Sequence, residues 1–209
     1  ARAWRGTGVE LLYVDDDHVF APTWVARSLA LRRAHPGAAV CAAGYRLEAY
    51  GGQPNPDLAA PQARPAKPFP LQFGYQVRRL MAALDGRRDG GALQQSWAKL
   101  DRSGHVDIAA GFGGVALRPE FLDEAAWQIP PVIWAVDDIW LSGHLARKGI
   151  AIWADRSLNL ARTCLQVSRA EALYHARIDG ADRRAANLAC IEHMRRTYGI
   201  WGGVAAQST

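Results

Sequence analysis

Short apolar runs and stretches of helical spacing alternate along the first part of the chain. Val9–Val14 is an apolar run with little alternation, which predicts a strand that is covered on both faces. Thr23–His35 follows Pro22 and carries apolar residues at helical spacing, so we expect a helix there. A second apolar run, Ala38–Ala43, predicts another strand. This order of strand, helix and strand is typical of an α/β sheet.

The middle of the chain is interrupted by proline and glycine. Gly51–Pro70 contains six prolines, which leave little room for a helix or a central strand and predict an irregular loop. A loop of this length is typical of a functional or a mobile segment. Helical spacing then covers Phe73–Leu84. Further along, Gly111–Gly114 separates two predicted strands, Val106–Ala110 and Val115–Leu117. Such a kink lets another group approach the backbone closely.

Helical patterns dominate the rest of the chain. Pro119–Glu124 predicts a short helix and Asp137–Lys148 a longer one. Ile150–Trp153 predicts a strand, and Arg183–Tyr198 predicts the last helix.

These elements predict a single α/β domain over residues 1–209. We expect a Rossmann-like, mostly parallel sheet flanked by helices, with the active cleft at the carboxyl edge of the sheet. Residues 160–209 would form a helical C-terminal segment that packs against it. With 49% hydrophobic and 22% charged residues, the chain can bury a substantial core.

Composition excludes several classes of protein. No run of eighteen apolar residues and no signal-peptide pattern occurs, so neither a membrane span nor a secretory segment is predicted. The three cysteines, Cys41, Cys164 and Cys190, fit neither a disulfide framework nor a CxxC metal site. A reducing, cytoplasmic location is the simplest interpretation.

The chain carries a net charge of +5, with a pI near 9.4. Its arginines are scattered, mostly as pairs inside predicted helices, and no lysine-rich or aromatic-interleaved motif accompanies them. We therefore expect no nucleic-acid partner. The basic excess is compatible with holding a diphosphate or with peripheral contact at the inner face of a membrane.

Two acidic clusters carry the candidate chemistry. Asp15, Asp16 and Asp17 follow the first predicted strand, where open α/β sheets bind ligands. Their mutual repulsion favours a divalent cation, and hard oxygen ligands favour Mg²⁺ or Mn²⁺. The alternative is an acidic turn that caps the next segment. Asp137 and Asp138 open a predicted helix, where capping explains one of them and leaves the other available as a general base.

The residues Tyr13–Asp17 resemble the DxD or DDD element of GT-A glycosyltransferases. Gly111–Val115, with Arg118 downstream, looks like the glycine-rich strand that lines their donor and acceptor pocket. Asp137–Leu141 is similar to the motif that opens the acceptor-side helix in family-2-like members. The three elements occur in the family's order and cover Val9–Trp153.

The resemblance implies a metal-dependent glycosyltransferase that moves a sugar from a UDP- or GDP-sugar to a glycan, lipid-linked or protein acceptor, with Mn²⁺ or Mg²⁺ as cofactor. Asp17 would ligate the metal. Asp15 would contact the nucleotide and the metal, and Asp16 would support one or both. Asp138 would be the catalytic base of an inverting displacement, with Asp137 as its neighbour or helix cap.

Other positions follow from the same resemblance. Gly113 and Gly114 would keep the floor of the donor pocket low. Trp140 would wall the acceptor site, although a buried core tryptophan explains it equally well. His175 would be the later metal-binding histidine of some members, with a surface histidine as the alternative.

Two other interpretations stay open. GT-A enzymes place a long nucleotide-binding segment before the DxD strand, and only fourteen residues precede Asp15 here. The resemblance thus implies an N-terminally truncated version, and a non-catalytic module that binds a glycan or a partner is one alternative. A haloacid-dehalogenase-type phosphatase is the other, with Asp15 as nucleophile and Asp17 as acid/base, although the usual Gly-Thr is missing.

Overall fold

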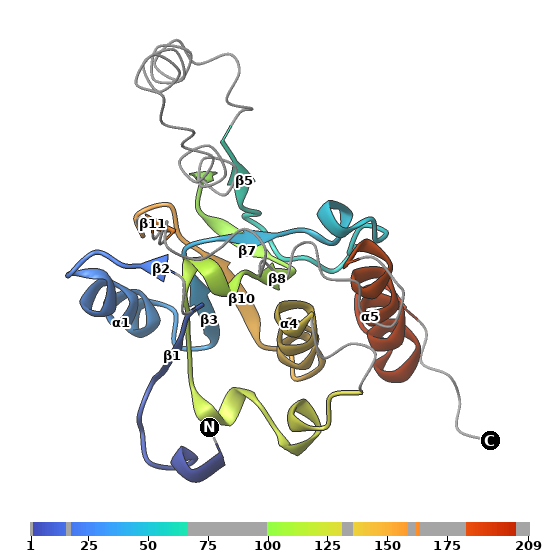
Figure 1. Ribbon diagram of the computed structural model, residues 1–209, viewed down its shortest axis with the longest axis horizontal. Coiled ribbons are helices and arrows are strands. Elements are labelled where there is room, and N and C mark those ends of the chain that lie inside the picture. The colour runs from blue at the N-terminus through green and yellow to red at the C-terminus, as the bar shows by residue number, and fades with distance from the viewer. Residues whose placement is uncertain are drawn as a thin grey trace.

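The computed structural model describes residues 2–15, 18–66, 100–130, 136–158, 162–163 and 183–203. Within these residues the chain is an α/β protein with a mixed five-stranded sheet and three α-helices (Figure 1). Four sequence predictions fall outside the described residues: the helix Phe73–Leu84, the metal ligand Asp17 with its neighbour Asp16, and His175.

The central sheet has the strand order β1-β9-β3-β10-β7. The bounds are β1 Leu11–Tyr13, β9 Val115–Leu117, β3 Ala38–Cys41, β10 Ala151–Ala154 and β7 Gly104–Val106. Only β3 and β10 pair in parallel, and the other three pairings of this sheet are antiparallel. The expectation of a mostly parallel sheet is therefore wrong for the described strands.

The position of β9 explains the difference. The strand, helix and strand at the start of the chain are present as expected, and β1 and β3 run in the same direction because both pair antiparallel with β9. They are not neighbours, since β9 lies between them. This strand follows a tight glycine turn and needs no helical crossover, which a parallel neighbour would require.

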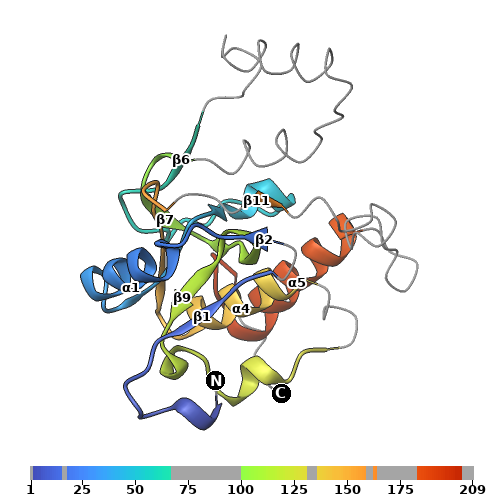
Figure 2. The same cartoon turned by 60° about the vertical axis from the view of Figure 1, so that its left-hand side comes forward.

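Helices cover both faces of the sheet. The first helix, α1 (Trp24–Ala34), packs on β3 and β9, and α4 (Asp137–Arg147) packs against β10 from the other side (Figure 1). All four residues of β3 are buried, as a continuous apolar run predicts. The last helix, α5 (Arg183–Tyr198), packs on α4, away from α1 (Figure 2). The predicted helices at these three places are confirmed.

Shorter elements connect the sheet and the helices. The small strands are β2 His18–Val19, β4 Gly44–Tyr45, β5 Arg64–Pro65, β6 Leu100–Arg102, β8 Ile108–Ala109 and β11 Arg162–Thr163. They pair as β4 with β8, β5 with β6 and β2 with β11. The 3-10 turns are η1 Arg2–Trp4, η2 Leu47–Tyr50, η4 Gly111–Gly113, η5 Pro119–Phe121 and η6 Glu124–Trp127.

Two of these details refine sequence predictions. In place of the short helix expected over Pro119–Glu124 lies the 3-10 turn η5, and a second 3-10 turn, η6, begins at Glu124. The proline-rich loop is irregular over residues 51–63 apart from an isolated bridge at Gln62, and it contains the two-residue strand β5; its residues 67–70 lie outside the described residues.

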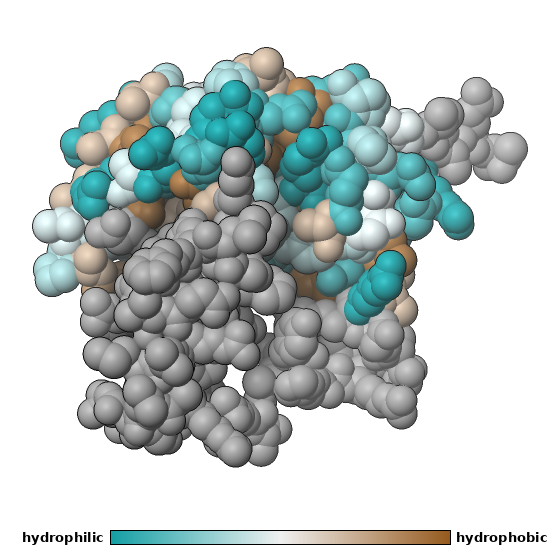
Figure 3. Space-filling view, turned by 90° about the horizontal axis from the view of Figure 1, so that it is seen from above, coloured by the Kyte–Doolittle hydropathy of each residue, from teal (hydrophilic) through white to brown (hydrophobic). Residues whose placement is uncertain are grey.

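No described helix is long and apolar enough to cross a membrane. Seen from above, most of the described surface is hydrophilic, with apolar residues scattered in small groups (Figure 3).

Candidate functional site

The pairing of β1 with β9 brings Asp15 to the glycine turn. In this register Tyr13 lies opposite Val115, so the chain beyond Tyr13 runs alongside the residues that precede Val115. A Cβ atom placed on Gly111 would lie 2.8 Å from Oδ1 of Asp15. The first acidic cluster is therefore in contact with η4 through its first aspartate.

The second acidic cluster reaches the same point from α4. The amide of Gly111 donates a hydrogen bond to Oδ1 of Asp138 over 2.9 Å. The Cβ position on Gly111 that lies close to Asp15 is also 3.1 Å from this oxygen. The two carboxylate oxygens are therefore within about 6 Å of each other, close enough to share a ligand or hydrated divalent cation. The fold thus brings Asp15 and Asp138 into one site.

The pKa values of two tyrosines are raised by the negative charge of the carboxylates at this point. The pKa of the Tyr13 phenol is raised well above its ordinary value, first by burial and then by Asp138. Asp137 and Asp15 raise this pKa further. The pKa of the Tyr45 phenol is also raised, by burial and by Asp138. Both phenols therefore stay protonated and can serve as hydrogen-bond donors next to carboxylates.

Asp137 has a different environment from its neighbour. Its side chain is exposed and makes no ion pair with a described residue. Val136 occupies the N-cap position of α4, so both aspartates lie in the first helical turn. In this position they interact favourably with the helix dipole. The expected role of Asp137 as an N-cap residue is therefore wrong, whereas its role as a neighbour of Asp138 agrees with the structure.

The glycine that faces the carboxylates is Gly111. Gly113 packs against the strand end at Ala43, where an added Cβ would lie 2.9 Å from the Ala43 Cβ. Gly114 has a φ of 79°, and a Cβ here would overlap the ring of Trp24. Gly113 and Gly114 therefore each have a packing contact that leaves no room for a Cβ, and their place in the donor pocket stays a prediction. The position of Gly111, first in the run, was the available signal for the glycine nearest the carboxylates.

Trp140 belongs to the core. It is 1% exposed, and its indole N–H donates a 2.8 Å hydrogen bond to the carbonyl of Ala126. It packs with apolar residues of α4 and α5 such as Ile139 and Ile191. The expectation that Trp140 walls the acceptor site is thus corrected to the alternative, a buried tryptophan.

Arg118 lies at the far end of β9 from the glycine turn. It forms a 3.6 Å ion pair with Glu10, and its side chain is 52% exposed. Because Leu117 pairs with Leu11 at the start of β1, Arg118 is separated from Gly111 by the length of β9. It does not take part in the carboxylate site.

Aromatic side chains that the sequence did not single out lie next to the site. Phe112, inside η4, has its ring centroid 5.9 Å from that of His18. Phe112 and Tyr45 both pack, half-buried, against Ala43 and Ala110. Such rings offer apolar faces to a ligand beside the carboxylates.

Buried thiols do not contribute a nucleophile. Cys41 and Cys190 are free and buried. Burial, together with the charges of Asp138 and Asp155, raises the pKa of the Cys41 thiol far above its ordinary range. Burial raises the pKa of Cys190 to about 12. Both therefore remain neutral, inert side chains.

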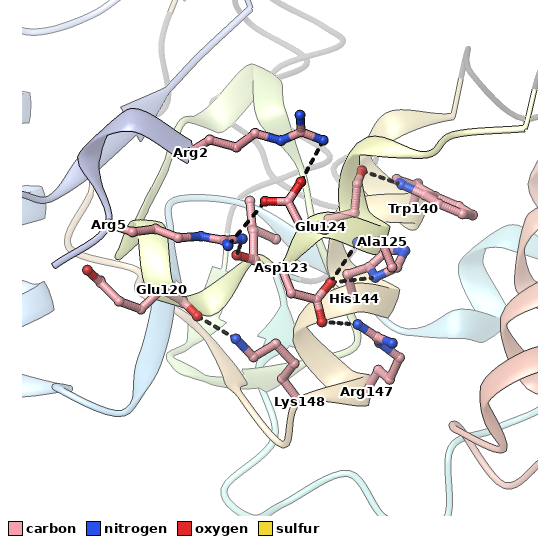
Figure 4. Close-up of polar contacts among 12 residues, drawn as sticks. Arg2, Arg5, Glu120, Asp123, Glu124, Ala125, Trp140, His144, Arg147 and Lys148 are labelled. Atoms are coloured by element: carbon pink, nitrogen blue, oxygen red, sulfur yellow. Dashed lines mark hydrogen bonds and ion pairs between the residues drawn. The ribbon is translucent and has the colours of Figure 1, made fainter.

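The helix that carries Asp138 is fixed at its other end (Figure 4). Arg147 pairs with Asp123, and the Lys148 ammonium donates to the carbonyl of Glu120. The N-terminal segment joins this network, because Arg2 and Arg5 both pair with Glu124. This end of α4 is therefore held by η5 and η6.

The donor chemistry of the site fits a divalent cation. Asp15 and Asp138 bring carboxylate oxygens close to Gly111, which has no Cβ to hold them apart, and carboxylate oxygens suit Mg²⁺ and Mn²⁺. Among the described residues, no cluster of three or more His, Cys, Asp or Glu side chains could hold a metal. Mg²⁺ sites of this kind use one or two carboxylates and substrate phosphates.

Comparison with known proteins returns no match: no family model, no curated protein and no solved structure is similar to this chain. Its function is therefore argued from its own residues and their geometry.

Proposed function

We propose that the protein is a metal-dependent glycosyltransferase of the GT-A type. It would transfer a sugar from a UDP- or GDP-sugar to a hydroxyl of a glycan, lipid-linked or protein acceptor. The observation that carries the proposal is the convergence of Asp15 and Asp138 on Gly111. Two carboxylates at one point of the fold are the groups that a general base and a ligand for a divalent cation require.

Asp138 is the proposed general base. The hydrogen bond from the Gly111 amide holds one of its oxygens in place. An acceptor hydroxyl beside this carboxylate gives up its proton to Asp138 as its oxygen bonds to the anomeric carbon. The bond from that carbon to the diphosphate oxygen breaks, and the nucleoside diphosphate leaves with the electron pair. Attack opposite the leaving group inverts the anomeric configuration.

Asp15 and Asp17 are the proposed residues for the donor and its cation. When bound, Mn²⁺ or Mg²⁺ would neutralise the charge that develops on the leaving diphosphate. Asp15 would also accept hydrogen bonds from the nucleotide, since it lies across the site from Asp138. The raised pKa of Tyr13 keeps a phenol O–H available beside both carboxylates.

Thermal unfolding with and without ligand tests this proposal. A ligand at about 100 times its dissociation constant stabilises the folded state by about 2.7 kcal/mol. For a chain of this size we expect Mn²⁺ with UDP or GDP to raise Tm by about 5 °C or more. Asp17→Asn should abolish this increase. The matched control is Asp57→Asn, which makes the same charge change at an exposed loop position and should keep it.

Activity assays separate the alternatives. Transfer or hydrolysis of a UDP- or GDP-sugar supports the enzyme. A Tm increase without turnover indicates a non-catalytic binding module, and hydrolysis of a generic phosphate ester without a nucleotide effect indicates a phosphatase. If Mn²⁺ and nucleotide together leave Tm unchanged in the intact chain, the glycosyltransferase proposal is wrong.

A further inference from the structure

Side chains of α4 cover one edge of the β8–η4 segment. The other edge of β8 pairs with β4. On the α4 side, the Ala109 amide donates to Oγ of Ser142 over 3.0 Å, and the Gly111 amide donates to Oδ1 of Asp138 over 2.9 Å. Two side chains of a helix thus take the place of a neighbouring strand.

The spacing of the two contacts matches on both elements. Asp138 and Ser142 are four residues apart on α4 and lie on the same face of the helix. Four residues advance a helix by about 6 Å, and two residues advance an extended segment by about 6.6 Å. The amides of residues 109 and 111 therefore meet the two acceptors in register.

The Ser142 contact is the more deeply buried of the two. Ser142 is 1% exposed and Ala109 is fully buried. Water cannot readily replace the hydroxyl as acceptor there, so loss of the hydroxyl would leave a buried N–H unsatisfied. The Gly111 contact is only partly buried, and it depends on where the backbone of residues 109–111 is held.

We propose that Ser142 is a positioning residue for Asp138. By binding the Ala109 amide it fixes the backbone so that the Gly111 amide stays on the Asp138 carboxylate. Ser142 lies behind the site and acts through residues 109–111. Its catalytic consequence rests on the proposed function, in which Asp138 is the base, whereas the structural coupling can be measured without any substrate.

Amide hydrogen exchange in the intact, ¹⁵N-labelled chain measures the coupling. In Ser142→Ala we expect the Gly111 amide to exchange about tenfold faster relative to the Met194 amide in α5, which reports the stability of the core. Ser142→Thr keeps the hydroxyl and should restore most of the protection. Ile191→Val removes one buried methyl group of α5 at a comparable cost in stability and should leave the ratio of Gly111 to Met194 unchanged.

The outcomes decide the proposal. An unchanged ratio in Ser142→Ala, or an equal change in Ser142→Ala and Ile191→Val, would overturn it. If the intact chain also transfers sugar, kcat should fall in Ser142→Ala while the KM for the donor stays the same, because only the base is displaced. If no transfer occurs in the wild type, the proposed function fails, and the exchange ratio still decides the role of Ser142.

Discussion

The two ends of α4 hold charged side chains in opposite arrangements. At the C-terminal end, Arg147 pairs with Asp123, and the ring of His144 is fully buried among aromatic side chains. At the N-terminal end, the carboxylates of Asp138 and Asp15 converge on one backbone amide. The first arrangement pairs opposite charges, and the second brings two carboxylates to one backbone amide.

We therefore expect the two ends of α4 to have different roles. A pair of opposite charges stabilises the fold modestly and needs no ligand. Two carboxylates that meet at one backbone amide present several acceptor oxygens to a ligand or a cation. Substitutions at the C-terminal end should therefore change stability, and substitutions at the N-terminal end should change binding and turnover.

The largest expected effect is on catalysis. Asp138→Asn keeps an oxygen that can accept the Gly111 amide hydrogen bond but loses the basic carboxylate. We expect kcat for sugar transfer to fall by about 10²- to 10⁴-fold, with little change in Tm, measured from initial rates and thermal unfolding.

The control makes the same substitution at the opposite end. Asp123→Asn keeps the oxygen that accepts the Ala125 amide but loses the charge paired with Arg147. We expect a loss of about 1 kcal/mol or less in stability, since this pair is partly exposed, and unchanged kcat per folded molecule. A larger loss of kcat in Asp123→Asn than in Asp138→Asn would contradict the division of roles.

The next effect is a loss of stability in acid that originates from His144. Burial is the main cause that lowers the pKa of this side chain from 6.5 to about 4, and Arg147 and His193 lower it further, while Asp123 opposes them. Between these values the unfolded chain binds a proton that the folded chain does not. His144 therefore makes unfolding easier as pH falls from 6.5 to about 4, by about 3 kcal/mol in total.

Urea unfolding at a series of pH values tests this effect. Other groups also titrate in this range, so the measured quantity is the difference between wild type and His144→Leu. The decline in the free energy of unfolding should be about 3 kcal/mol smaller in the variant. If the free energy of unfolding falls equally with pH in the two proteins, protonation of His144 does not destabilise the folded state, and water reaches this end of α4.

Local patterns in the sequence were sufficient for the three described α-helices and for two carboxylates that lie close together, whereas the strand expected over Val106–Ala110 is divided into β7 and β8 with different partners. Helical spacing located α1, α4 and α5, and the two acidic motifs named Asp15 and Asp138, which the fold brings together. Each of these features depends only on residues that lie close together in the sequence.

Features that depend on residues distant in the sequence could not be predicted from local patterns. The place of β9 between β1 and β3 is a choice of strand pairing that periodicity does not encode. An apolar residue such as Trp140 has the same local pattern whether it faces a core or a ligand. The roles of Gly113 and Gly114 depend on Ala43 and Trp24, which are remote in sequence.

The smallest expected effect concerns two glycines: Gly149, which follows the C-terminal end of α4, and Gly111, which contacts Asp138 near its N-terminal end. Gly149 follows the helix with a φ of 68° and open space around it, so Gly149→Ala should cost about 1 kcal/mol in backbone strain, or about 2–4 °C in Tm. Gly111→Ala instead places a methyl group 2.8 Å from the Asp15 oxygen and 3.1 Å from the Asp138 oxygen, so the two carboxylates of the proposed site must move apart. We expect a similar Tm for the two variants without ligand, and loss of the increase with Mn²⁺ and nucleotide only in Gly111→Ala. If both variants keep that increase, the carboxylates beside Gly111 are not the binding site, because a methyl group there would have displaced them.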